Sequence, residues 1–127
     1  MPFRFNSEVR ILPDLSTAST NLIAQFDVSS YETFALQFQN NYTAVAAQGI
    51  VVQASYDPSA NIGATAAPGW VTLTTASVPF PSSILASAGA LTSAIANAYH
   101  WIRVLGGVSA TASGDVRVRI GGFRSSG

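Results

Sequence analysis

Apolar and polar residues alternate with a period of two along much of this chain, and no other feature limits its fold as strongly. In the segment 33–39, Phe34, Leu36 and Phe38 alternate with small or polar residues. Successive side chains of a strand point to opposite faces, so this pattern predicts a strand with one buried face. Asn40 and Asn41 follow it as a turn signal.

Further segments show the same strand pattern and are bounded by Pro, Gly, Asn or Asp. They are 3–11, 21–28, 49–56, 70–75, 99–105 and 115–120, and a loop is expected at 61–69. Short strands at this spacing are typical of a sandwich or barrel. The predicted fold is all-β, a jelly-roll-like antiparallel β-sandwich of seven to eight strands. We expect a single domain over residues 1–127, with 1–12 as an N-terminal arm or strand.

One segment departs from the period of two. Within 83–97 and just beyond, apolar residues recur at helical spacing, namely Ile84, Ala88, Leu91, Ile95 and Tyr99. This spacing predicts one short helix near 83–97, with Ser82 or Ser83 as its N-cap. Gly89 weakens it by about 1 kcal/mol relative to Ala. The alternative is a long ordered loop that packs on a neighbouring subunit.

Charge is scarce in the middle of the chain, where Asp57 is the only charged residue between Glu32 and Arg103. So few charges suit a protein whose faces are covered by neighbours. Six Arg balance six acids, so the chain lacks the basic excess of a nucleic-acid binder. No apolar run is long enough to span a membrane, and no signal peptide begins the chain, so we expect synthesis in a cytoplasm.

Residues suited to catalysis are few. His100 is the only His, there is no Cys, and the six acids are scattered. A lone His without partners that tune it is more often structural than catalytic. We therefore expect no enzymatic activity, no metal site and no cofactor.

The last two predicted strands carry three Arg. Arg117 and Arg119 alternate with Val116 and Val118, so both project from one face, and Arg103 lies nearby if the two strands form a hairpin. Such a group can dock an acidic partner. The alternative is a solvated face on which the Arg pair with Glu32 or Asp27.

Two aromatic residues raise the possibility of a sugar platform. Trp70 follows Pro68 and Gly69 at the edge of a loop, and Tyr56 ends a predicted strand. Exposed aromatic rings can stack on sugars, whereas packing in a core or an interface is the more common role of such residues.

The order of several motifs resembles that of a known class of proteins. A strand ending in Ser55-Tyr56-Asp57 is followed by a Gly69-Trp70 strand, then by 101–104 and by 113–122 with its Gly turn. This order resembles small β-sandwich virion proteins of tailed bacteriophages, such as capsid decoration (cement) proteins. The resemblance covers roughly residues 33–122.

The resemblance implies a non-enzymatic protein on the exterior of the virion that binds the major capsid protein and stabilises the head, commonly as a homotrimer. The residues expected at capsid or inter-subunit contacts are Phe3, Arg4, Phe5, Arg103, Arg117 and Arg119. An N-terminal arm would add a strand to a neighbour. The alternatives are a carbohydrate- or receptor-binding module of a tail or spike, with Tyr56 and Trp70 stacking on the glycan, and a neck or tail component.

Overall fold

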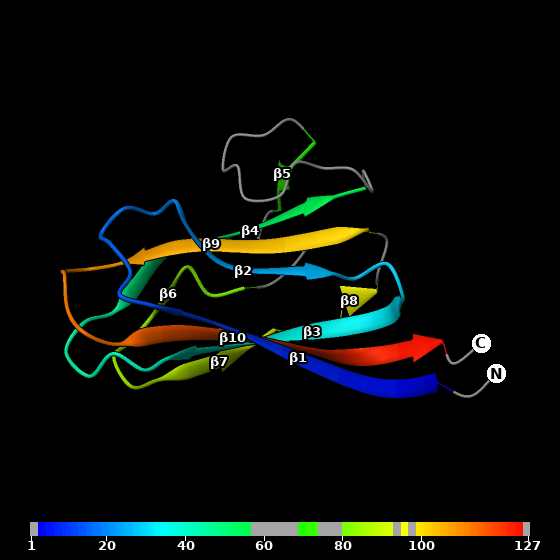
Figure 1. The fold of residues 1–127 in the computed structure, drawn as a ribbon, viewed down its shortest axis with the longest axis horizontal. Coiled ribbons are helices and arrows are strands. Elements are labelled where there is room, and N and C mark those ends of the chain that lie inside the picture. The colour runs from blue at the N-terminus through cyan, green and yellow to red at the C-terminus, as the bar shows by residue number, and fades with distance from the viewer. Residues whose placement is uncertain (1–2, 57–68, 74–79, 93–94, 97–98, 126–127) are drawn as a thin grey trace.

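The computed structural model describes residues 3–56, 69–73, 80–92, 95–96 and 99–125, which contain ten strands in two antiparallel sheets (Figure 1). Sheet A consists of β1 (Phe3–Pro13), β10 (Asp115–Ser125), β3 (Tyr31–Asn40), β7 (Gly89–Leu91) and β8 (Ile95–Ala96). Sheet B consists of β2 (Asn21–Asp27), β9 (Trp101–Val108), β4 (Ala47–Ser55), β5 (Val71–Thr72) and β6 (Ser83–Ile84).

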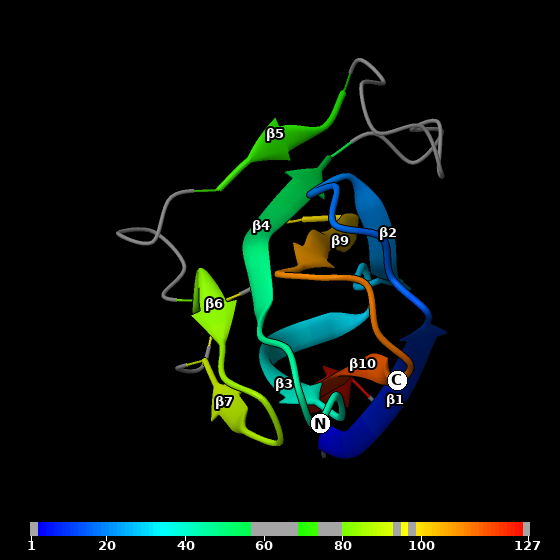
Figure 2. The same cartoon turned by 90° about the vertical axis from the view of Figure 1, so that its left-hand side faces the viewer.

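The chain crosses repeatedly from one sheet to the other. Sheet A has the strand order β1-β10-β3-β7, with β8 also on β3, and sheet B has the order β2-β9-β4-β5, with β6 also on β4. Figure 2 shows the two sheets from one end, with β1 and β2 together along one side. Two antiparallel sheets interleaved in this order form a jelly roll, as the alternating pattern predicts.

The core lies between the sheets and is built from the alternating positions. Phe34, Leu36 and Phe38 of β3 are buried, as the pattern predicts. They meet the inward residues of the other long strands, among them Phe26, Ile50, Val52, Ile102, Val104, Val116, Val118 and Ile120. Burial of these apolar side chains, at roughly 25 cal/mol per Å², is the main stabilising contribution.

The helix predicted near 83–97 is wrong, because the described residues of this segment form the short strands β6, β7 and β8. β6 pairs with β4, while β7 and β8 pair with β3. The backbone groups at the edges of β3 and β4 need hydrogen-bond partners, and this requirement outweighs a weak helical pattern without charge pairs. Leu91, placed in the buried stripe of the expected helix, is 73% exposed.

Residues 3–13 form a strand of the domain rather than an arm. β1 pairs with β10 without interruption from Phe3 opposite Ser125 to Pro13 opposite Asp115. The side chains of Phe3, Arg4 and Phe5 lie outside the described part of the structure, as does most of the loop expected at 61–69.

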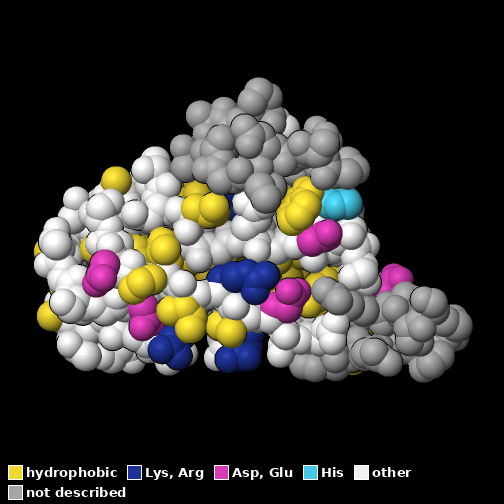
Figure 3. Space-filling view, viewed as in Figure 1, with side chains coloured by type: hydrophobic (Ala, Val, Ile, Leu, Met, Phe, Trp, Pro, Cys, Tyr) yellow, Lys and Arg dark blue, Asp and Glu magenta, His cyan; other side chains and the backbone are white. Residues whose placement is uncertain are grey.

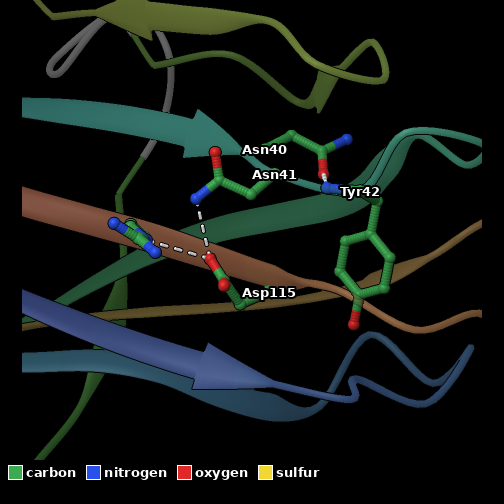
Figure 4. Close-up of polar contacts among 5 residues, drawn as sticks. Asn40, Asn41, Tyr42 and Asp115 are labelled. Carbon is green, nitrogen blue, oxygen red and sulfur yellow. Dashed lines mark hydrogen bonds and ion pairs between the residues drawn. The ribbon is translucent and has the colours of Figure 1, made fainter.

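A polar network fixes the turn after β3. The backbone N–H of Tyr42 donates to Asn40 Oδ1 (2.9 Å), and the side-chain amide of Asn41 donates to Asp115 Oδ1 (2.8 Å) (Figure 4). The buried Tyr42 hydroxyl accepts the backbone N–H of Leu15 at 2.8 Å. Gly114 has φ +155°, and a Cβ there would lie 2.6 Å from the Tyr42 ring, so this close approach requires glycine.

No helix among the described residues is long and apolar enough to cross a membrane.

Candidate docking face on sheet A

The outer surface of sheet A presents its side chains in rows that run across the strands. One row consists of the small residues Ser7, Gly121 and Ala35, which are opposite one another in β1, β10 and β3. The next row consists of Val9, Arg119, Gln37 and Leu91, from β1, β10, β3 and β7. The third row contains Ile11, Arg117 and Gln39. We call these three rows, together with Phe123, the sheet A face.

A hollow of about 300 Å³ lies over the row of small residues. It is lined by Ser7, Ala35, Leu36, Gln37, Leu91, Arg119 and Gly121. The hollow exists because the three adjacent strands have small side chains, or no side chain at Gly121, in this row, while the neighbouring row has long side chains. A bulky side chain of a partner can therefore enter between them.

Large apolar side chains are exposed on the sheet A face, and one of them, Leu91, lines the hollow. Leu91 is 73% exposed, and Ile11 and Phe123 are each 49% exposed. Figure 3 shows hydrophobic and Arg side chains next to one another along the lower margin of the molecule, where β1 and β10 lie in Figure 1. Three of the six large apolar side chains exposed among the described residues lie on this face. Exposed apolar side chains that share one face are typical of a surface that binds a partner.

The two Arg of the face differ in their partners. Both are exposed, as the alternation in β10 predicts. Arg117 Nε donates to Asp115 Oδ1 at 3.0 Å. This bond lowers the pKa of Asp115 below its ordinary value, and the bond from Asn41 makes the next largest contribution in the same direction. Arg119 has no ion-pair partner among the described residues and is flanked by Val9 and Gln37. The expected pairing of the Arg with Glu32 or Asp27 is not the arrangement found for Arg117.

Arg103 does not join Arg117 and Arg119, because β9 and β10 belong to different sheets. Its side chain is fully buried, with Nε donating to Gln53 Oε1 at 2.7 Å and the guanidinium 4.2 Å from the centre of the Trp70 ring. Burial lowers the pKa of Arg103 from its ordinary value. Arg103 therefore holds Trp70 against sheet B and is not available to a docking partner.

Tyr56 and Trp70, the residues considered for glycan stacking, have different surroundings. Trp70 is half-buried, and one face of its ring covers Arg103. Tyr56 is 71% exposed, and its ring lies 5.7 Å from that of Tyr99. The structure therefore does not place the two as a matched pair of open rings.

Titratable side chains do not gather into a catalytic or metal-binding cluster in the part of the chain that the structure describes. No group of three or more His, Asp or Glu residues there is placed to hold a metal ion. His100 Nε2 lies 3.7 Å from Asp27 Oδ2, and its ring contacts Trp101.

The sequence pattern predicts that Arg117 and Arg119 share one face, but it does not predict the hollow or the exposure of Leu91 beside it. The helical spacing places Leu91 in a helix, and the pattern of 3–11 does not show which face of that strand is buried. The row of Ser7, Gly121 and Ala35 depends on the register of strands far apart in the sequence, so no local pattern marks it.

The architecture defines the class of this protein, a jelly-roll β-sandwich. Neither protein-family models nor curated proteins give a match. Similar solved structures include the SPBc2 prophage-derived protein YomS (9% identity, TM-score 0.48, 93% of this chain and 95% of that chain).

The capsid of Ralstonia phage GP4 is also similar (8% identity, TM-score 0.48, 98% and 86% of the two chains). The IMPa metallopeptidase from Pseudomonas aeruginosa is similar as well (16% identity, TM-score 0.46). The match covers 98% of this chain but only 13% of the metallopeptidase chain. All of these TM-scores lie below 0.5, and such similarities carry no conclusion about what this chain does.

Proposed function

We propose that this chain is a non-enzymatic structural protein of a phage virion, a capsid decoration (cement) protein that binds the major capsid protein on the exterior of the head. The observation that carries the proposal is the sheet A face, which combines exposed apolar side chains, a hollow and an Arg without an acidic partner among the described residues. The jelly roll supports it by analogy only, since the fold serves viral capsid proteins and lectins alike.

The chemistry of the face indicates its partner. Arg119 lies at the rim of the hollow, where a guanidinium can receive a carboxylate through two hydrogen bonds. Leu91 and the small residues beside it offer apolar contact. The proposed docking segment of the capsid protein therefore carries an acidic residue next to a bulky apolar one.

The scarcity of charge supports repeated, modest contacts. Asp57 is the only charged residue between Glu32 and Arg103, and the residues of this segment on the sheet A face (Ala35, Gln37, Gln39 and Leu91) carry no charge, which keeps the cost of desolvating them low. A capsid presents many equivalent sites, and several linked copies then bind far more tightly than one. The proposal requires a homo-oligomer, for which the resemblance to decoration proteins favours a trimer.

The test is cosedimentation of the purified chain with heads that lack it, taken from the phage that encodes it. Leu91→Asp and Arg119→Glu are each expected to weaken binding at least about tenfold, equivalent to 1.4 kcal/mol. The matched control is Leu85→Asp, because Leu85 is 76% exposed but does not line the hollow. Ala35→Phe fills the hollow without changing charge and is also expected to weaken binding.

Two outcomes would contradict the proposal. The first is that heads retain the Leu91 and Arg119 variants as well as the unmodified chain. The second is that Leu85→Asp reduces binding to the same extent, because the loss would then be unspecific. Circular dichroism of each variant separates a loss of binding from a loss of fold.

A glycan- or receptor-binding role in a tail or spike is the second candidate, and the exposure of Tyr56 favours it. On that interpretation Tyr56→Ala abolishes binding to a glycan array, while the variants of the sheet A face bind normally. If the chain is a decoration protein, the array shows no binding. In the sedimentation assay the variants of the sheet A face then bind heads weakly, while Tyr56→Ala binds normally. A neck or tail component is the third candidate role. Locating the labelled chain on the particle distinguishes this role from decoration of the head.

A further inference from the structure

β1 is the terminal strand of sheet A, and its second edge has no strand partner among the described residues. The strand is eleven residues long, and its register with β10 has no bulge. Figure 2 shows β1 at the margin of the molecule, with β2 above it. A long, regular and open edge is a template for pairing with another strand.

The backbone groups that face this edge follow from the ladder. Asp14 N donates to Gly114 O at 3.0 Å, which extends the register of β1 with β10. Residues bonded to a partner strand alternate along an antiparallel ladder, so the even-numbered residues of β1 bond to β10. The backbone groups of Ser7, Val9 and Ile11 therefore point to the open edge. In agreement, the Val9 carbonyl accepts a bond from the Arg10 side chain at 3.1 Å, and a strand that pairs at this edge would replace that bond.

Two opposite charges stand on either side of Val9. Glu8 and Arg10 share the face of β1 opposite to Val9 and form an ion pair at 3.5 Å. Arg10 also lies over the Phe26 ring, 5.1 Å from its centre. Any strand that pairs with β1 here must meet one negative and one positive charge, two residues apart.

We propose that β1 pairs antiparallel with β1 of a second copy of this chain, across a twofold axis at Val9. In this register Val9 lies opposite Val9 of the second copy, and Ser7 lies opposite its Ile11, so outward-facing backbone groups meet. Glu8 then lies opposite Arg10 of the second copy, and the reverse pair forms on the other side. Opposite charges at such directly opposed positions stabilise a sheet.

The neighbouring registers are excluded by charge. A twofold axis at Glu8 sets two Glu8 side chains opposite each other, and an axis at Arg10 sets two Arg10 side chains opposite each other. An axis at Ser7 sets Arg10 opposite Arg4. Like charges at directly opposed positions are destabilising. A twofold axis that passes between two residues sets odd-numbered residues opposite even-numbered ones. The edge-facing backbone groups of one copy would then meet residues whose backbone groups are already bonded to β10 in the other.

The pairing joins the A sheets of two copies into one continuous sheet. The outer row that contains Val9 and Arg119 then continues into the same row of the second copy. This inference does not depend on the proposed function. The pairing has twofold symmetry, whereas the resemblance to decoration proteins implies a trimer, so the solution mass distinguishes them.

The first experiment is sedimentation equilibrium of the purified chain over a range of concentrations. The mass is expected to rise from 13.2 kDa to twice that value. Glu8→Arg and Arg10→Glu are each expected to remain monomeric, because each places like charges opposite each other. An equimolar mixture of the two variants is expected to dimerise, and so is the double variant carrying both changes.

These variants keep the test independent of folding, since the mixture restores pairing only if both chains are folded. A trimer, a monomer at every concentration, or single variants that dimerise as well as the unmodified chain would overturn the inference. If the chain stays monomeric at every concentration, Glu8 and Arg10 are instead charged residues that prevent the edge of β1 from pairing.

A cross-link tests the register. The chain has no Cys, so Val9→Cys introduces a single thiol. Residues opposite each other in a bonded pair have Cα atoms about 5.5 Å apart, within the range of a disulfide. Mild oxidation is expected to yield a disulfide-linked dimer of Val9→Cys. Gln39→Cys, on the same outer face but on β3, is expected to yield none, and equal cross-linking of both would overturn the register.

Discussion

Single polar side chains fix the turn that follows β3, and their loss is measurable. The Tyr42 hydroxyl accepts the buried N–H of Leu15 at 2.8 Å. We expect Tyr42→Phe to lower the free energy of unfolding by about 1–3 kcal/mol, because a buried donor loses its partner. Urea denaturation measures the change. Tyr56→Phe is the control, since the side chain is 71% exposed and a change within about 0.5 kcal/mol is expected there.

Asp115 gives the turn a defined dependence on pH. The bonds from Arg117 and Asn41 lower its pKa in the folded state. A carboxyl with a lowered folded pKa stabilises the protein above its unfolded pKa of about 3.9, and this contribution is lost as the pH falls through the folded pKa. We expect Asp115→Asn to be less stable than the unmodified chain at pH 7, with the difference shrinking below about pH 4. A difference that stays constant down to pH 2 would contradict this assignment.

At the scale of the elements, a side chain continues the ladder where β7 ends. Thr92 N donates to Leu36 O at 2.9 Å, and Leu36 N donates to Thr92 Oγ1 at 2.9 Å. We expect Thr92→Val to cost about 1–3 kcal/mol, because a buried N–H of β3 loses its acceptor. Thr111→Val, at an exposed position, is the control in the same thermal or urea unfolding assay. Equal stability of the two variants would contradict the role of Thr92.

The long strands and β5 were predictable from the sequence, while β6, β7 and β8 were not. Phe34, Leu36 and Phe38 mark β3 because each contributes to one buried face, so the local pattern carries the information. β6, β7 and β8 form because the edges of β3 and β4 need hydrogen-bond partners. The residues 83–97 alone carry no information about this requirement, because β3 and β4 lie elsewhere in the sequence. Strand order in the chain groups Arg103 with Arg117 and Arg119, whereas β9 and β10, although consecutive in the chain, belong to opposite sheets.

At the scale of the whole molecule, balanced charge and exposed apolar groups act together. The chain is formally neutral at pH 7, with a sequence pI near 6.5. We expect the solubility of the isolated protein to be lowest near pH 6.5 and to rise on both sides, because molecules without net charge do not repel one another. Leu91→Lys is expected to raise solubility at pH 7 by adding charge to the sheet A face. A flat solubility profile from pH 5 to 8 would contradict the argument.

The adjacent ends of β1 and β10 determine how the domain responds to a pull. Phe3 lies opposite Ser125, and Figure 1 shows the start of β1 and the end of β10 on the same side of the molecule. Force applied between the ends would peel β1 from β10 one rung at a time, beginning at Phe3. Force applied across the sheet A face would instead load many rungs at once. Force between these two strand ends is therefore expected to separate β1 from β10 more easily than force that loads the whole ladder at once.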